Sequence, residues 1–187
     1  MRVLICYGTT EGQTRKIAEF VADIVREKGH EAALFDASDV SALEPSRCQA
    51  AILAGSVHMG RYQGALVHHI RDWHERLNGM PSAFISVSLA AAGDDPHGRA
   101  EIDETAQKML RDSGWLPKAT LHAAGALRFT QYDFFKRWIM RAIARQHQSD
   151  VDVHSDTEYT DWDDVRVFVE DFLAKLPTEG DDEKKAG

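Results

Sequence analysis

Short apolar runs alternate along the chain with longer segments in which apolar residues recur at helical spacing. Three of these runs, Val3 to Tyr7, Ala50 to Ala54 and Ala83 to Val87, are apolar nearly throughout, which is typical of strands buried on both faces of a sheet. Ala32 to Phe35 and Leu121 to Leu127 are two further predicted strands. Strands and helices that alternate in this way predict an α/β fold with a parallel sheet and right-handed crossovers.

The helical segments lie between the predicted strands and after the last one. Their apolar positions are Ile17, Phe20, Val21, Ile24 and Val25; Leu66, Ile70, Trp73 and Leu77; Ile102, Ala106, Met109 and Leu110; and Val165, Phe168, Val169, Phe172 and Leu173. Gly29 and Gly114 predict helix ends, and Thr160 or Asp161 is expected to cap the last helix. Ligands in such a fold bind beyond the carboxyl ends of the strands.

Composition narrows the class of protein. A chain of 187 residues with 43% hydrophobic and 28% charged residues suits one globular domain, and its net charge of −8 argues against a general nucleic-acid binder. The two cysteines, Cys6 and Cys48, form neither a CxxC motif nor a cluster with histidines, so we expect a reducing compartment and no metal site. No apolar stretch is long enough for a signal peptide or a membrane span, which favours a cytoplasmic location.

The first predicted strand is followed by Gly8-Thr9-Thr10-Glu11-Gly12-Gln13-Thr14, which leads into a helix. A helix start at the carboxyl edge of a sheet offers unpaired N–H groups and the positive end of the helix dipole, and the threonines add hydroxyl donors. The loop lacks the lysine of a Walker A motif and the GxGxxG pattern, so it suits a monophosphate such as that of FMN. A Thr/Gly-rich turn that merely caps the helix is the structural alternative.

This loop resembles the flavodoxin pattern Ser/Thr-x-Thr-Gly-x-Thr at Thr9, Gly12 and Thr14, and departs from it at Glu11, which we expect to contribute its backbone N–H. Other motifs narrow the resemblance: Gly12-Gln13-Thr14-Arg15, Met80-Pro81-Ser82-Ala83-Phe84, Gly125-Ala126-Leu127-Arg128 and Tyr159-Thr160-Asp161-Trp162. Together they are similar to the menaquinone-dependent protoporphyrinogen oxidase family of bacterial haem biosynthesis, from residue 1 to about residue 176.

The resemblance implies a flavodoxin-like, doubly wound five-stranded sheet of order 2-1-3-4-5. It also implies that FMN takes electrons from protoporphyrinogen IX and that a respiratory quinone such as menaquinone receives them. The phosphate loop, with Thr10, would then hold FMN together with two further loops, Gly55 to Tyr62 and Ser88 to Gly98. The expected contacts in these loops are Ser56-Val57-His58-Met59-Gly60 with Tyr62, and Ser88-Leu89-Ala90-Ala91. The third loop carries no aromatic residue where electron-carrier flavodoxins usually have one, which favours a bound substrate.

Three residues of the second loop have alternative interpretations. His58 could donate to flavin N5 or relay a proton, or it could be an ordinary surface histidine, and no catalytic residue is assigned beyond this candidate. Arg61 could attract porphyrin propionates or be solvated. Tyr62 could stack on the flavin or pack where the next helix begins.

An insertion at 128–159 separates the fifth predicted strand from the last helix. Residues 132–147 have helical periodicity, with aromatic and aliphatic residues on one face. Between residues 128 and 147 there are five basic residues and one acidic residue, and the candidates for contact with substrate or membrane are Arg128, Lys136, Arg137, Trp138, Arg141 and Arg145. Such a helix could lie on an anionic membrane surface, meet the quinone, bind porphyrin carboxylates, or pack on its own domain.

We therefore expect an FMN-binding domain at 1–176 that includes the insertion, and a disordered polar tail at 177–187. The expected activity is quinone-linked oxidation of protoporphyrinogen IX, with a possible peripheral position on the cell membrane. The alternative is a flavodoxin-like electron carrier or an FMN-dependent quinone reductase. The sequence leaves the oligomeric state open.

Overall fold

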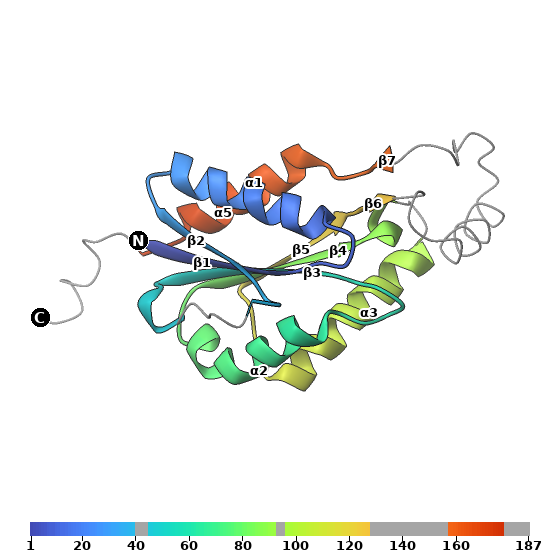
Figure 1. Cartoon of the computed structure of the whole chain (residues 1–187), viewed down its shortest axis with the longest axis horizontal. Helices are drawn as coiled ribbons and strands as arrows, with labels where there is room; N and C mark the ends of the chain where they lie inside the picture. Colours follow the sequence, from blue (N-terminus) through green and yellow to red (C-terminus); the bar gives the residue numbers. More distant parts are fainter. Residues whose placement is uncertain (40–44, 93–95, 128–156, 178–187) are drawn as a thin grey trace, which may run out of the picture.

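A five-stranded parallel sheet forms the centre of the protein (Figure 1). The computed structural model describes residues 1–39, 45–92, 96–127 and 157–177. The strands of the sheet are β1 (Arg2–Gly8), β2 (Glu31–Asp36), β3 (Ala50–Ser56), β4 (Ser82–Ser88) and β5 (Ala119–Ala124). They are arranged in the order β2-β1-β3-β4-β5, which confirms the predicted fold class. All seven residues of β4 are buried, as expected for a central strand covered on both faces.

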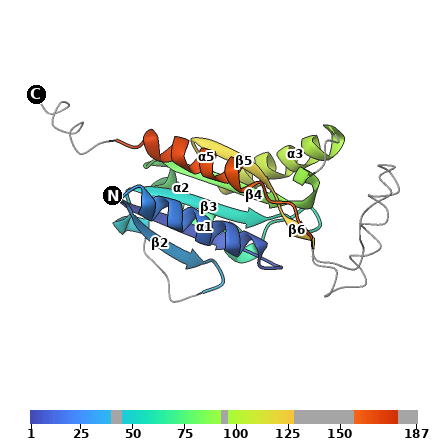
Figure 2. The ribbon, with the colours of Figure 1, turned by 90° about the horizontal axis from the view of Figure 1, so that it is seen from above.

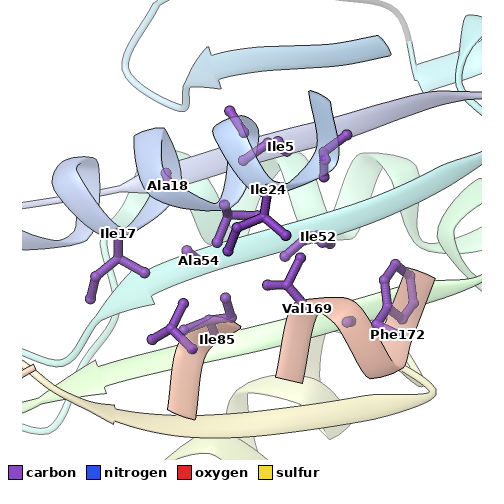
Figure 3. Close-up of a cluster of buried hydrophobic side chains, with 14 of the residues drawn as sticks. Ile5, Ile17, Ala18, Ile24, Ile52, Ala54, Ile85, Val169 and Phe172 are labelled. Atoms are coloured by element: carbon purple, nitrogen blue, oxygen red, sulfur yellow. The ribbon is translucent and has the colours of Figure 1, made fainter. Parts of the chain in front are cut away.

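Helices cover both faces of the sheet (Figures 1 and 2). The helices are α1 (Gln13–Glu27), α2 (Gly64–Asn78), α3 (Pro96–Ser113) and α5 (Trp162–Ala174). Helices α1 and α5 lie on one face, and α2 and α3 lie on the other (Figure 1). Each face therefore has its own hydrophobic core. In the core under α1 and α5, Ile5, Ile52 and Ile85 of neighbouring strands meet Val169 and Phe172 of α5 (Figure 3).

Hydrogen bonds show which residue caps α5 and where the last strand of the sheet ends. The cap of α5 is Asp161, whose side chain accepts hydrogen bonds from the backbone N–H groups of Asp163 and Asp164. The last predicted strand, 121–127, begins two residues earlier and is interrupted at Gly125. The Gly125 N–H donates to the Ser88 carbonyl, while its own carbonyl accepts from Tyr159, so the chain leaves the sheet at this residue.

Beyond Gly125, the short strand β6 (Ala126–Leu127) pairs with β7 (Thr157–Glu158) in an antiparallel ladder. The two ends of the predicted insertion are therefore joined next to the sheet. The predicted helix at 132–147 and the candidates Arg128, Lys136, Arg137, Trp138, Arg141 and Arg145 lie outside the described residues. The residues of the predicted tail from 178 onward also lie outside them, and the boundary at 176 stays a prediction.

Two features are absent from the described part of the chain. Within the described ranges, no helix is long and apolar enough to cross a membrane. The same residues contain no group of three or more His, Cys, Asp or Glu side chains that could hold a metal ion.

Candidate functional site

A cavity of about 360 Å³ lies beyond the carboxyl ends of β1, β3 and β4. All three loops proposed from the sequence contribute to its wall. The lining residues are Thr9, Glu11, Gln13, Thr14, Ser56, Val57, His58, Met59, Gly60, Val87, Ser88, Leu89, Ala90, Gly98, Glu101, Ile102, Thr105, Gly125 and Ala126. Parallel strands present their carboxyl ends at one edge of a sheet, so loops that are far apart in sequence meet there.

The phosphate loop turns tightly between β1 and α1. Gly12 precedes α1 with φ +87°, a left-handed conformation that glycine adopts without steric cost. The Gly12 N–H donates to Thr9 Oγ1 over 2.9 Å, which closes the loop. A side chain at Gly8 would place its Cβ 2.9 Å from Gln63 Oε1 and 3.0 Å from Leu66 Cβ, so any larger residue would require Gln63 and α2 to shift.

Two polar side chains at the start of α1 are buried in this wall without satisfying all their hydrogen-bonding atoms. Gln13 is 5% exposed and Thr14 is 1% exposed. Gln13 Oε1 and Thr14 Oγ1 have no hydrogen-bond partner among the described residues. A buried hydroxyl without a partner is costly, and Thr14 lies at the positive end of a helix dipole. These groups therefore fit a ligand that carries a phosphate.

Gln63, the residue before α2, connects the first loop to the second. Its amide Nε2 donates to Thr10 Oγ1 over 2.9 Å and to Ser56 Oγ over 2.6 Å. Since each hydroxyl accepts from Gln63, each can use its own proton for another acceptor. Thr10 is exposed and does not line the cavity, whereas Ser56 does.

The second loop is a two-residue hairpin. His58 and Arg61 pair across it, with backbone N–H to carbonyl distances of 2.9 and 3.1 Å. Met59 and Gly60 between them have φ +50° and +72°, the signature of a type I′ turn. A left-handed methionine is uncommon and costs about 1–2 kcal/mol. Its side chain is 75% exposed at the rim of the cavity, so this loop holds an apolar side chain toward solvent.

Tyr62 packs where α2 begins, which is the second of the two alternatives considered from the sequence. It is 8% exposed, and its hydroxyl lies 2.7 Å from Ser86 Oγ. Its ring meets Phe84 edge to face with centroids 5.4 Å apart. Burial raises the pKa of Tyr62 to about 12. The side chain does not line the cavity, so its position favours packing, the second alternative, over stacking on the flavin.

The third loop begins with the short 3-10 helix η2 (Leu89–Ala92) after β4. The Ala91 N–H donates to Ser88 Oγ over 3.2 Å, which turns the chain away from the sheet. Ser88, Leu89 and Ala90 line the cavity, and Ala91 does not. This wall consists of small and aliphatic side chains, in agreement with the absence of an aromatic residue noted in the sequence.

The sequence does not predict that α3 forms one wall of the cavity, although Gly98 lies at the end of the expected third loop. Helix α3 contributes Gly98, Glu101, Ile102 and Thr105, which follow the i, i+3, i+4, i+7 spacing of a single helix face. That periodicity is present in the sequence, but Ile102 was interpreted as part of the core alone. Gly125 and Ala126 were also missed because the predicted fifth strand continued through them.

Comparisons with known proteins agree with this geometry. Residues 4–154 match the family model described as "Flavodoxin domain". A protein of Escherichia coli (strain K12) named "Protoporphyrinogen IX dehydrogenase [quinone]" is 31% identical over 181 residues, which cover 95% of this chain and 99% of that protein. A protein of the same name from Leishmania major is 30% identical over 174 residues, covering 92% of this chain and 75% of that protein.

Solved structures agree on the fold. Oxidised flavodoxin 1 from Bacillus cereus superimposes with a TM-score of 0.56 at 16% identity, covering 95% of this chain and 100% of that one. The flavodoxin of Streptococcus pneumoniae TIGR4 gives a TM-score of 0.55 at 14% identity, covering 94% of this chain and 100% of that one.

Proposed function

The chain belongs to the flavodoxin domain family and, within it, to the family of protoporphyrinogen IX dehydrogenases (quinone), and from this membership we propose that it oxidises protoporphyrinogen IX to protoporphyrin IX and passes the electrons to a quinone. This reaction belongs to haem biosynthesis. The observation that carries the proposal is identity of about a third along nearly the whole chain to proteins of that name, together with a cavity suited to the cofactor of the fold.

FMN is the cofactor of this domain, and the phosphate loop fits its phosphate. Thr14 offers a buried hydroxyl proton that has no acceptor in the described structure, and the N–H groups at the start of α1 add the positive end of the helix dipole. Thr9 stabilises the turn through Gly12. Among the described residues that line the cavity there is no lysine or arginine, so we propose that amides and hydroxyls hold the phosphate. We propose that Thr10, Glu11 and Gln13 take part in this loop.

The second and third loops would flank the flavin ring. We propose that Ser56, Val57, His58, Met59 and Gly60 border one side. Ser88, Leu89, Ala90 and Ala91 would border the other, where small side chains leave room for a bulky tetrapyrrole. Tyr62 takes part in this proposal only through its backbone, because its side chain is buried against Ser86.

Bound FMN supplies an acceptor of two electrons per cycle, and conversion of the porphyrinogen to the conjugated macrocycle removes six electrons. The chain must therefore leave an edge of the cavity accessible to both the donor and the quinone. Met59 at the rim, with most of its surface exposed, offers an apolar contact to either. His58 is the candidate for holding a proton beside the ring, and Arg61, exposed on the same turn, is the candidate for attracting propionates.

The finer parts of the proposal concern the quinone and the membrane. We propose menaquinone as the acceptor and a peripheral contact with the cytoplasmic face of the cell membrane. Support comes from the excess of basic residues at 128–147 in a chain of net charge −8. Arg128, Lys136, Arg137, Trp138, Arg141 and Arg145 are the proposed contacts.

The test uses the full chain reconstituted with FMN under anaerobic conditions. Protoporphyrinogen IX and a menaquinone analogue are added, and protoporphyrin is followed by its fluorescence. We expect oxidation that depends on protein, FMN and quinone together. Absence of protoporphyrin while a pyridine nucleotide reduces the same protein rapidly would refute the proposal and support a quinone reductase or electron carrier. Matched vesicles with and without anionic lipid test the membrane contact, which fails if sedimentation is the same with both.

A further inference from the structure

The segment formed by β7 and the residues directly after it is attached to the start of α1, although the two are separated by more than 140 residues in the sequence. Lys16 Nζ lies 2.9 Å from Glu158 Oε2. Gln13 Nε2 donates to Thr160 Oγ1 over 2.9 Å. The attachment therefore reaches a residue that lines the cofactor cavity, because Gln13 forms part of its wall.

The hydroxyl of Thr160 can accept from Gln13 but cannot donate to it. Its single proton goes to the Ala124 carbonyl at the end of β5, 2.8 Å away. The nitrogen of the Gln13 amide must therefore face Thr160, because the amide oxygen would find no donor there. Lys16 lowers the pKa of Glu158, and Trp162 and Gln13 add smaller effects in the same direction.

In this arrangement Gln13 Oε1 serves only as a hydrogen-bond acceptor. The atom is buried, it can only accept, and no described residue donates to it. A phosphate oxygen offers no proton, so Gln13 Oε1 does not suit the phosphate itself. It suits a hydroxyl group next to the phosphate, and the ribityl chain of FMN carries hydroxyls in that place. Thr14, the next residue along the helix, has the opposite role because its hydroxyl can donate to the phosphate.

We propose that Thr160 is a positioning residue of the cofactor site, which fixes the Gln13 amide so that Oε1 accepts a hydrogen bond from a ribityl hydroxyl. The proposal rests on the FMN site described above. Thr160 itself does not line the cavity and acts through Gln13. A residue directly after the 128–159 insertion thereby contributes to recognition of the sugar-alcohol part of the cofactor.

The experiment measures binding of four ligands to the full-length apoprotein: FMN, riboflavin, lumiflavin and inorganic phosphate. Riboflavin lacks the phosphate, lumiflavin lacks the ribityl hydroxyls, and phosphate lacks the flavin. Thr160→Val is expected to weaken the binding of FMN and of riboflavin about tenfold each, which is the effect of one hydrogen bond. The affinities for lumiflavin and phosphate should stay within about twofold of the wild-type values. Thr160→Ser keeps the hydroxyl and is expected to restore the affinity for both ribityl ligands.

Two further variants separate positioning from a general effect on the fold. Gln13→Met removes the acceptor and should reproduce the same ligand pattern, and adding Thr160→Val to it should cause no further loss for riboflavin. Trp162→Phe removes the hydrogen bond from Trp162 Nε1 to Glu158 in the same segment, but leaves Thr160 and Gln13 in place. It should change none of the four affinities.

Equal weakening of all four ligands by Thr160→Val would overturn the proposal, because it would indicate a structural role. Unchanged riboflavin affinity in either Thr160→Val or Gln13→Met would also overturn it. If Thr160→Val does not fold, the affinities of Gln13→Met for the same four ligands test whether the Gln13 amide binds the ribityl chain. Failure of the wild-type chain to bind FMN would refute the proposed function, whereas normal FMN binding with unchanged variants refutes the positioning role alone.

Discussion

Replacing Thr14 by valine removes one hydroxyl and nearly preserves the shape of the side chain. Thr14 is 1% exposed, and its Oγ1 has no hydrogen-bond partner among the described residues. A buried polar atom without a partner costs about 1–3 kcal/mol of stability. We therefore expect Thr14→Val to stabilise the apoprotein by about 1 kcal/mol, which raises Tm by about 2–4 °C in a domain of this size.

The same change is expected to weaken FMN binding. A hydrogen bond to a charged group contributes about 1.5–3 kcal/mol, which corresponds to roughly a 10- to 140-fold increase in Kd. Stability and affinity should therefore change in opposite senses. Calorimetry of the apoprotein gives the first quantity, and quenching of flavin fluorescence gives the second. Riboflavin, which has no phosphate, should bind the variant and the wild type almost equally.

Thr105→Val is the matched control, since Thr105 lines the cavity on α3 and not in the phosphate loop. It should leave the ratio of FMN to riboflavin affinity unchanged. The reasoning would be refuted if Thr14→Val lowered the Tm of the apoprotein and left that ratio at its wild-type value, because the hydroxyl would then serve the fold and not the ligand.

Two substitutions and one chemical modification test the surrounding structure. Gln63→Leu should weaken the binding of both FMN and riboflavin severalfold in fluorescence titrations, because Thr10 and Ser56 lose the shared donor that orients their hydroxyls. Unchanged affinities would contradict this expectation. Trp115→Ala should lower the free energy of unfolding, measured in urea, by about 3–5 kcal/mol, because Trp115 is fully buried. A decrease below about 1 kcal/mol would show that the surrounding side chains fill the space left by the indole ring. Burial raises the pKa of Cys6 to about 12, so a thiol reagent at about pH 8 should modify Cys6 only after unfolding in urea.

Local patterns in the sequence were sufficient for the sheet and for most of the loops that line the cavity. Runs such as Val3 to Tyr7 are apolar on both faces, and only a strand covered by helices on both sides buries them completely. The phosphate loop was predictable because its glycines, threonines and helix start are contiguous. The alternatives for Tyr62 could not be separated from the sequence, because an aromatic residue next to a loop can face either the ligand or the core. Its packing depends on Phe84 and Ser86 of the distant strand β4.

Contacts between distant segments could not be predicted in the same way. Gln63 was not singled out, because its partners Thr10 and Ser56 lie on two other loops. The pairing of β6 with β7 is a ladder of two residues at each end of a long intervening segment, too short to leave a periodic pattern. Gly125 was read as strand because its neighbours are apolar, and only its hydrogen bonds to Ser88 and Tyr159 show that the sheet ends there.

The sequence by itself determined the fold class, the five strands and the cofactor, because these depend on local periodicity and on one contiguous loop at a helix start. Only the tertiary structure decided which atoms of that loop remain available to a ligand. Thr160 uses its proton on Ala124, and this turns the amide of Gln13, so the hydrogen-bonding character of the site depends on residues at opposite ends of the chain. A hydroxyl has one proton, and its use is decided by its neighbours in space.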